Sequence, residues 1–123
     1  MIPDKHDCGT VTFEASEAIP VGSLVTLATD GTISVAAITE EATGTAAEQA
    51  HAAPQRIGVD LFSKPGTMVG IAAASFNPGQ VLYGQNAGKI STSTAGSALR
   101  VGIAKGAAGA NNDLVEFIPD KGA

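Results

Sequence analysis

IPVGSLV, at residues 19–25, is matched by FNPGQVL at residues 76–82, 57 positions later (76 − 19). DGTIS at residues 30–34 has its counterpart in AGKIS at residues 87–91, at the same separation (87 − 30). Both copies are apolar and punctuated by glycine, which is typical of strands joined by tight turns. Because an internal repeat constrains the whole fold, the chain is predicted to contain two similar β units.

A further pair of blocks extends the repeat. RIGV at residues 56–59 matches RVGI at residues 100–103, but these lie 44 positions apart (100 − 56). The first copy would then carry 13 extra residues (57 − 44), at about residues 42–54. This Ala-rich segment contains TAAE, the spacing of a helix capping box, and alanine favours helix. It is predicted to be an insert that holds either a short helix around residues 45–53 or a loop with one helical turn.

Short apolar and alternating segments separated by Gly, Pro and Asn predict about nine strands, and hence an all-β barrel or sandwich. The strands are expected at residues 10–14, 24–28, 33–37, 56–61, 67–73, 81–83, 89–92, 100–104 and 114–118. Structural turn positions are expected at Gly22, Asp30, Gly31, Gly58, Gly79, Gly88 and Gly102.

The polar N-terminus, residues 1–9, is expected to be a flexible arm. The remainder, residues 10–123, is of ordinary single-domain length. We expect one β domain whose repeats span about 19–71 and 76–118.

Charge and composition exclude several classes of function. The net charge is −5, and the Lys and Arg residues do not cluster, so the chain lacks the basic surface of a nucleic-acid or anionic-membrane binder. The N-terminus has no apolar signal region, and no apolar run is long enough for a transmembrane helix. The single cysteine excludes an internal disulfide. These features predict a protein made in a cytoplasm.

No motif predicts a catalytic, cofactor or metal site. His6 and Cys8 could bind a metal, but a structural zinc site needs four ligands, and the one other histidine, His51, lies in the predicted insert. Cys8 with His51 lacks the sequence context of an activated nucleophile. The chain is therefore not predicted to be an enzyme, and no cofactor is expected.

With strands, turns and repeat placed, the sequence resembles the small decoration, or cement, proteins of tailed-bacteriophage capsids. Such proteins show a glycine turn before an apolar strand, a GVA-like strand and a final D(L/I)VEV-like strand. The segments that carry the resemblance are AIPVGSLVTLATDGTI (18–33), RIGVDLFSKPGTMVGI (56–71), NPGQVLYGQNAGKIS (77–91) and RVGIAKGAAGANNDLVEFI (100–118). The predicted insert and the arm depart from the family pattern.

The resemblance implies a virion protein, made in the host bacterium, that binds the exterior of an assembled capsid. It implies a homotrimer that bridges major capsid subunits and stabilises the shell. The arm could add a strand to a capsid sheet edge, which makes its residues the candidate capsid contacts. These residues are Ile2, Pro3, Asp4, Lys5, His6, Asp7 and Cys8.

Other functions stay open at this point. A small β-clip-like ligand-binding or accessory module of an enzyme system has similar turns, and a lipoyl-type domain has a similar repeat. Lys89 lacks the acidic neighbours of a lipoylated lysine. A secreted carbohydrate-binding sandwich is disfavoured by the absence of a signal sequence and by an aromatic content of 4%.

Overall fold

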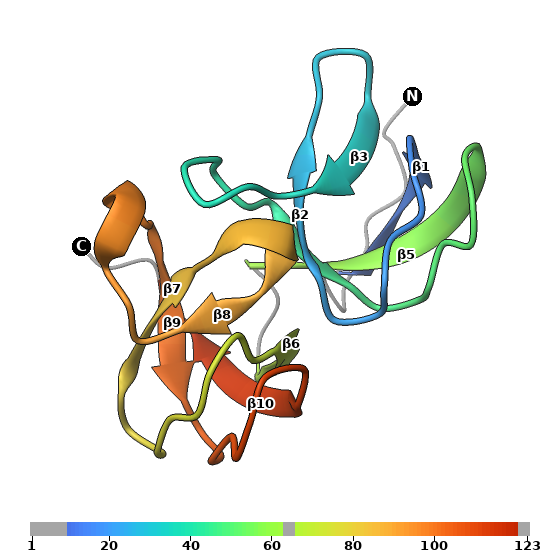
Figure 1. Cartoon of the computed structure of the whole chain (residues 1–123). Helices are drawn as coiled ribbons and strands as arrows, with labels where there is room; N and C mark the ends of the chain where they lie inside the picture. Colours follow the sequence, from blue (N-terminus) through green and yellow to red (C-terminus); the bar gives the residue numbers. More distant parts are fainter. Residues whose placement is uncertain (1–9, 63–65, 121–123) are drawn as a thin grey trace.

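The computed structural model describes residues 10–62 and 66–120. Five strands form a closed barrel in the order β1-β3-β2-β4-β5, and five more form a second sheet in the order β6-β10-β9-β7-β8 (Figure 1). The barrel contains β1 (Thr10–Ala15), β2 (Leu24–Leu27), β3 (Thr32–Val35), β4 (Gly44–Ala46) and β5 (Gln55–Leu61). The sheet contains β6 (Met68–Ile71), β7 (Val81–Gly84), β8 (Ile90–Ser91), β9 (Arg100–Ala104) and β10 (Leu114–Pro119), with 3-10 turns η1 (Asn86–Gly88) and η2 (Ala95–Ser97). We call residues 10–62 the first unit and residues 66–120 the second unit.

The two units have the same topology. If β1 to β5 correspond in order to β6 to β10, the strand order around the barrel is also the order of the second sheet. The barrel closes through parallel pairing of β1 with β3, which includes Ala15 opposite Ile33. In the second unit, an isolated parallel bridge joins Ala72 to Ile90, at the two equivalent positions. The repeat inferred from the sequence is therefore a repeat of strand order.

Pair registers fix the correspondence residue by residue. Leu24 lies opposite Thr45 in the first unit, and Val81 lies opposite Ile103 in the second. These pairs are offset by 57 positions on the first strand (81 − 24) and by 58 on the second (103 − 45). Isolated bridges follow the same rule, because Ile19↔Ala50 corresponds to Phe76↔Ala108. The backbone hydrogen bond from Gly22 N to Ala46 O, 2.8 Å, recurs from Gly79 N to Ala104 O, also 2.8 Å.

The register corrects the third block of the predicted repeat. RVGI at residues 100–103 corresponds to residues 42–45, and RIGV at residues 56–59 corresponds to residues 114–117. The separation is therefore 58 in both cases, and the first unit contains no insert of 13 residues. The two blocks are similar in sequence, but they belong to strands that have different positions in the strand order.

The helix predicted around residues 45–53 is not present. Residues 44–46 form β4, and Ala50 forms the bridge to Ile19. Ala46 and Ala50 are almost fully buried in the barrel, and about two turns of isolated helix would have been marginal in water. Glu48, predicted to cap the helix, accepts a 2.6 Å hydrogen bond at Oε1 from the Gly58 N–H instead. Pairing with neighbouring strands therefore overrides the local helical preference.

All nine predicted strands are present, and β4 is the strand that the sequence analysis missed. Four of the glycines predicted at turns have left-handed φ values: Gly22 (+87°), Gly31 (+88°), Gly79 (+86°) and Gly88 (+68°). Gly58 and Gly102 lie within β5 and β9 rather than at turns. Asp30 precedes Gly31 in the β2–β3 hairpin turn, as expected.

Each unit has its own buried cluster. The barrel interior includes Ile19, Ile33 and Ile57, all at most 1% exposed. The second cluster centres on Phe117, Leu82 and Ile90. Three residues of the first unit, Leu24, Ala36 and Ala42, belong to this second cluster, so apolar packing also joins the two units.

No helix in the described residues is long and apolar enough to cross a membrane.

Candidate functional site

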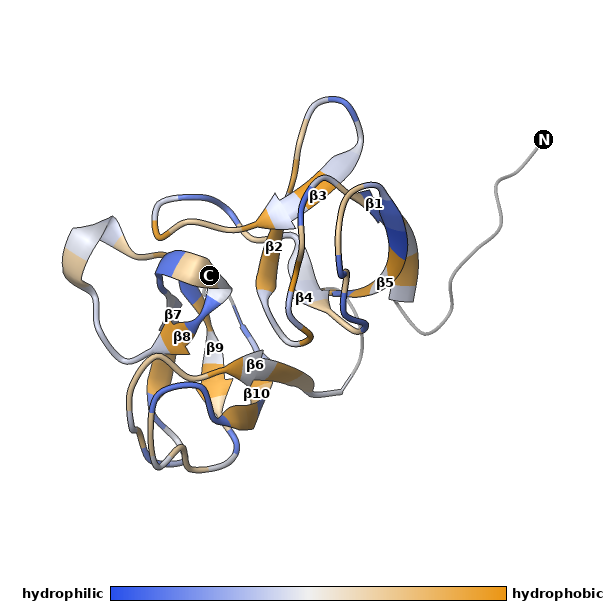
Figure 2. Ribbon diagram, turned by 45° about the vertical axis from the view of Figure 1, so that its right-hand side comes forward, coloured by the Kyte–Doolittle hydropathy of each residue, from blue (hydrophilic) through white to orange (hydrophobic). Residues whose placement is uncertain are grey.

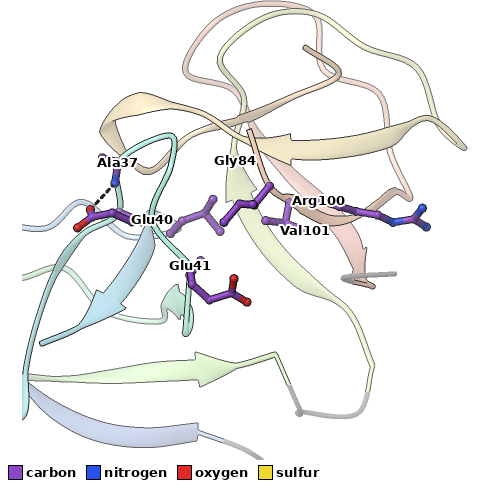
Figure 3. A pocket seen from close by; sticks show the side chains of 10 residues that line it. Ala37, Glu40, Glu41, Gly84, Arg100 and Val101 are labelled. Carbon is purple, nitrogen blue, oxygen red and sulfur yellow. Dashed lines mark hydrogen bonds between the residues drawn. The ribbon is translucent and has the colours of Figure 1, made fainter. Parts of the chain in front are cut away.

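The two units meet around a small hollow of about 10 Å³, measured as the space open to the centre of a water molecule (Figure 3). Its apolar wall comes from both units and includes Leu24, Ala36, Ala42, Gly84, Leu99 and Val101. Its polar margin carries Glu40, Glu41 and Arg100.

The polar groups at this margin do not converge. Glu40 Oε1 accepts a 2.8 Å hydrogen bond from the Ala37 N–H. Arg100 Nη2 lies 3.1 Å from Asp120 Oδ2, and its Nε donates to the Asp120 carbonyl oxygen. Figure 3 shows the Arg100 side chain pointing away from Glu40 and Glu41. The hollow is therefore a packing junction between units rather than a set of groups aimed at one substrate.

The turn η1 of the second unit holds this junction together. Gly88 N donates to Ala36 O at 3.1 Å, and Asn86 Oδ1 accepts from Ile38 N at 3.1 Å. A Cβ at Gly88 would lie 2.8 Å from Leu24 O, and φ at Gly88 is +68°, so both space and conformation require glycine. The corresponding turn of the first unit, at Gly31, has no atom within 4 Å of such a Cβ. The turn at Gly88 therefore packs closely against the first unit, whereas the equivalent turn at Gly31 has no such close neighbour among the described residues.

The residues singled out from the sequence are not gathered into one site. The candidate capsid contacts, Ile2 to Cys8, lie outside the described residues. His51 is exposed, and its backbone N–H donates to Gln55 Oε1 at 2.9 Å. Within residues 10–62 and 66–120, no three His, Cys, Asp or Glu side chains are grouped so that they could hold a metal ion.

The charges are divided unequally between the units. The first unit has seven acidic residues and one arginine, a net of −6 with His51 neutral (1 − 7). The second has three acidic and three basic residues, a net of zero (3 − 3). Two ion pairs hold four of its six charges: Lys105–Glu116 and Arg100–Asp120, each at 3.1 Å. The net acidity of the described chain therefore resides in the first unit.

Two exposed carboxyl groups have lowered pKa values. The pKa of Asp30 is lowered by hydrogen bonds from the hydroxyl and backbone N–H of Thr32, which stabilise the β2–β3 turn. The pKa of Glu116 is lowered by a hydrogen bond from Thr67, and further by the hydrogen bond and charge of Lys105. Both carboxylates therefore favour the charged form through local contacts.

The second unit carries an apolar surface on the outer side of its sheet. On β10, Leu114, Glu116 and Ile118 point outward, whereas Val115 and Phe117 are buried. Leu114 pairs with Ile71, and Ile118 pairs with Ile103, so these side chains lie side by side. We define the apolar face as Val69, Ile71, Ile103, Leu114 and Ile118, of which Ile71 is 8% exposed.

Several members of the apolar face are well exposed. Leu114 is 60% exposed, Ile118 46% and Val69 45%. Leu114 and Ile71 lie beside the first-unit turn at Gly22, since a Cβ on Gly22 would lie 3.3 Å from Leu114 Cδ2 and 3.4 Å from Ile71 Cγ1. These three are half of the large hydrophobic residues that are exposed in the described chain, the others being Val21, Leu27 and Leu99. Single exposed apolar side chains are normal, but a contiguous group indicates an interaction surface.

The first unit has polar residues at the equivalent places. By the register, Val69 and Ile71 correspond to Thr12 and Glu14 on β1. Leu114 and Ile118 correspond to Arg56 and Asp60 on β5. Figure 2 shows the contrast between hydrophobic residues on β10 and hydrophilic residues on β1. Since the same topology accepts polar side chains at these positions, folding alone does not require the apolar face.

The sequence analysis did not identify this surface, although a signal was present. The strand at β5 reads RIGVD, with polar residues at both ends of an alternating pattern. The strand at β10 reads LVEFI, with apolar residues on both faces. A strand that is apolar on both faces of an exposed sheet indicates burial on both sides.

Comparisons with known proteins show similarity at the level of the fold. No protein family matches the chain, and no curated protein matches it. A solved structure described as the head fiber gp8.5 N base of bacteriophage phi29 is similar, with a TM-score of 0.70 and 18% sequence identity. The match covers 91% of this chain and 95% of that one. The similarity establishes that the two chains share a fold over almost their whole lengths.

Proposed function

We propose that this chain is a structural, non-enzymatic protein of a bacteriophage virion that binds the exterior of the assembled capsid. The observation that carries the proposal is the shared fold with the phi29 head fiber base, which covers 91% of this chain. The sequence resemblance to capsid decoration proteins points to the same class by an independent route. The finer role is that of a cement protein, a homotrimer that bridges major capsid subunits after the protein is made in the host.

The mechanism of stabilisation is thermodynamic linkage. A protein that binds the assembled lattice, and not free capsid subunits, stabilises the lattice by RT ln(1 + [L]/Kd). A trimer that contacts several capsid subunits at once gains avidity, because its second and third contacts form at high effective concentration. This mechanism needs a rigid body with a binding surface and requires no reaction.

The N-terminal arm is proposed as one of the capsid contacts. Residues 1–8 precede β1, whose first residue, Thr10, already pairs with Asp60. An extended segment before a strand can add to an exposed sheet edge on a partner. Removing residues 1–8 deletes no residue of the described strands, and circular dichroism shows whether the shortened chain is folded.

The proposal is tested by co-sedimentation with capsids of the phage that encodes the chain. We expect binding to expanded capsids and not to unexpanded ones, and a higher melting temperature of expanded capsids when the protein is bound. Absence of binding to both forms would refute the capsid function. A chain that lacks residues 1–8 is expected to show reduced occupancy, and unchanged occupancy would remove the arm from the proposal while leaving the rest.

A further inference from the structure

We propose that the apolar face is where a second copy of this chain binds. The repeat supplies an internal control. At equivalent positions on the same topology, the first unit has Thr12 and Arg56 where the second has Val69 and Leu114. The shared topology therefore does not require exposed apolar side chains at these positions of the second unit.

The charges around the apolar face favour a second copy over a different protein. Glu116, at the centre of the outer side of β10, is paired with Lys105 at 3.1 Å. At the end of the same strand, Asp120 is paired with Arg100. The face therefore presents little unbalanced charge, and a different partner would find few of the complementary charges that commonly guide recognition.

A face that is apolar and locally neutral is complementary to itself. Where copies meet around a two-fold or three-fold axis, residues at the axis approach their own copies, so an unbalanced charge there would lie near a like charge. The net −6 of the described chain is carried by the first unit, whose equivalent surface is polar. Contact through the second unit therefore buries apolar surface where electrostatic repulsion between copies is weakest.

This inference specifies the self-association contained in the proposed function, but its test uses no capsids. Capsid binding can therefore be confirmed while self-association fails, and self-association can be confirmed while capsid binding fails. The first experiment measures the mass of the full chain by sedimentation velocity over a concentration series that begins at low micromolar. We expect a species of at least twice the monomer mass of 12.2 kDa. A monomer at every concentration would overturn the inference, including the case in which the same face later proves to bind the capsid.

Two matched variants test the location of the contact. Val69→Glu places one negative charge on the apolar face, and Thr12→Glu places the same charge at the equivalent position of the first unit. We expect Val69→Glu to raise the dissociation constant at least about tenfold, because a charge is costly to bury without a partner, and Thr12→Glu to have little effect. Equal weakening by both variants would mean that total charge, rather than this face, controls association.

A charge-free variant and an exchange measurement complete the test. The double variant Leu114→Gln/Ile118→Gln keeps the net charge, and circular dichroism and urea unfolding show whether it is folded. We expect it to be monomeric where the natural chain associates, and a folded variant that associates normally would refute the proposal. Amide exchange of the natural chain should slow with concentration in β10 but not in β5, its counterpart, whereas equal behaviour of the two strands would contradict the proposed location.

Discussion

Substitution of Gly44 by alanine is the most informative perturbation of the fold. An added Cβ would lie 2.1 Å from the carbonyl oxygen of Asp60. At Gly102, the equivalent position in the second unit, it would lie 2.2 Å from the carbonyl oxygen of Ile118. Both obstacles are backbone atoms of the paired strand, so relief requires the two strands to separate. Gly44→Ala and Gly102→Ala are therefore expected to be similarly destabilising.

The expected loss is about 3 kcal/mol for each variant, because a clash with a backbone atom, which cannot rotate away, takes the upper end of the overpacking cost. Overpacking costs roughly 1–3 kcal/mol, and disturbance of a ladder hydrogen bond adds about 1 kcal/mol. Replacing glycine returns roughly 0.4–1 kcal/mol, because the unfolded chain loses conformational freedom. Against a typical stability of about 5–15 kcal/mol, the loss is large and measurable. With a urea m-value of roughly 1.5 kcal/mol/M, the unfolding midpoint should fall by about 2 M.

Two control glycines make the test specific to the register. At Gly58 an added Cβ would lie 3.1 Å from Glu48 Oε1, the far end of a flexible side chain. Gly58→Ala should therefore cost no more than about 1 kcal/mol. At Gly106 the nearest atom would be Val115 Cγ1 at 3.9 Å, so Gly106→Ala should be neutral or stabilising by roughly 0.5 kcal/mol.

Equilibrium urea unfolding followed by far-UV circular dichroism measures all four variants. The block alignment RIGV/RVGI makes Gly58 the counterpart of Gly102, whereas the strand register makes Gly44 its counterpart. A Gly44→Ala variant within about 0.5 kcal/mol of the natural chain would refute the packing argument. Equal losses at Gly58 and Gly102, with none at Gly44, would restore the block alignment.

Three further substitutions test other contacts. Ser23 is buried and its Oγ has no hydrogen-bond partner in the described part of the chain. Ser23→Ala should therefore raise the free energy of unfolding by roughly 1 kcal/mol in the same urea assay. A loss of stability would show that the hydroxyl has a partner. The pKa of Glu116 is lower in the folded state, so its contribution is complete above the unfolded pKa, near the ordinary glutamate value of 4.5, and is lost as pH falls through the folded pKa. Glu116→Gln should therefore be less stable than the natural chain at neutral pH, with the difference shrinking below about pH 4.5 in urea titrations, and a difference independent of pH would contradict this. Leu24 is 2% exposed and packs into the cluster of the second unit. Leu24→Ala should therefore lower the free energy of unfolding by about 2–5 kcal/mol, measured by thermal or urea unfolding. A smaller loss would mean that packing between the units contributes little to stability.

The sequence predicted the strands well because their signals are local. Alternation and glycine turns mark nine of the ten strands, and the left-handed φ of Gly22 and Gly79 is a property of each turn alone. The strand β4 was missed because three residues, Gly-Thr-Ala, carry no alternation to detect. Its identity depends on its partners, since Gly44 pairs with Leu61 of β5 and Thr45 with Leu24 of β2.

The wrong block of the repeat has a related cause. The true counterpart of RVGI is ATGT at residues 42–45, and that of RIGV is LVEF at residues 114–117. Between RVGI and ATGT, glycine is the one letter in common, while RIGV and RVGI are alike because both occupy strands with an apolar face. Strands with similar burial therefore have similar sequences here, whereas strands with equivalent pairing partners do not. The candidate surface was missed for the same reason, because its meaning depends on comparing Leu114 with Arg56, and that comparison needs the register.

The repeat separates the positions that the topology constrains from those that it leaves open. At Gly44 and Gly102 a backbone oxygen of the neighbouring strand excludes any side chain, and both units have glycine. At Arg56 and Leu114 the side chain points outward from equivalent strands, and the two units differ completely in polarity. A difference of this kind within one chain cannot come from the shared topology. The proposed contact between copies would account for it, with water over the acidic first unit and a second copy over the apolar face of the second. Functional residues are therefore expected at positions where the two units differ. Residues that maintain the fold are expected at positions where the two units have the same residue.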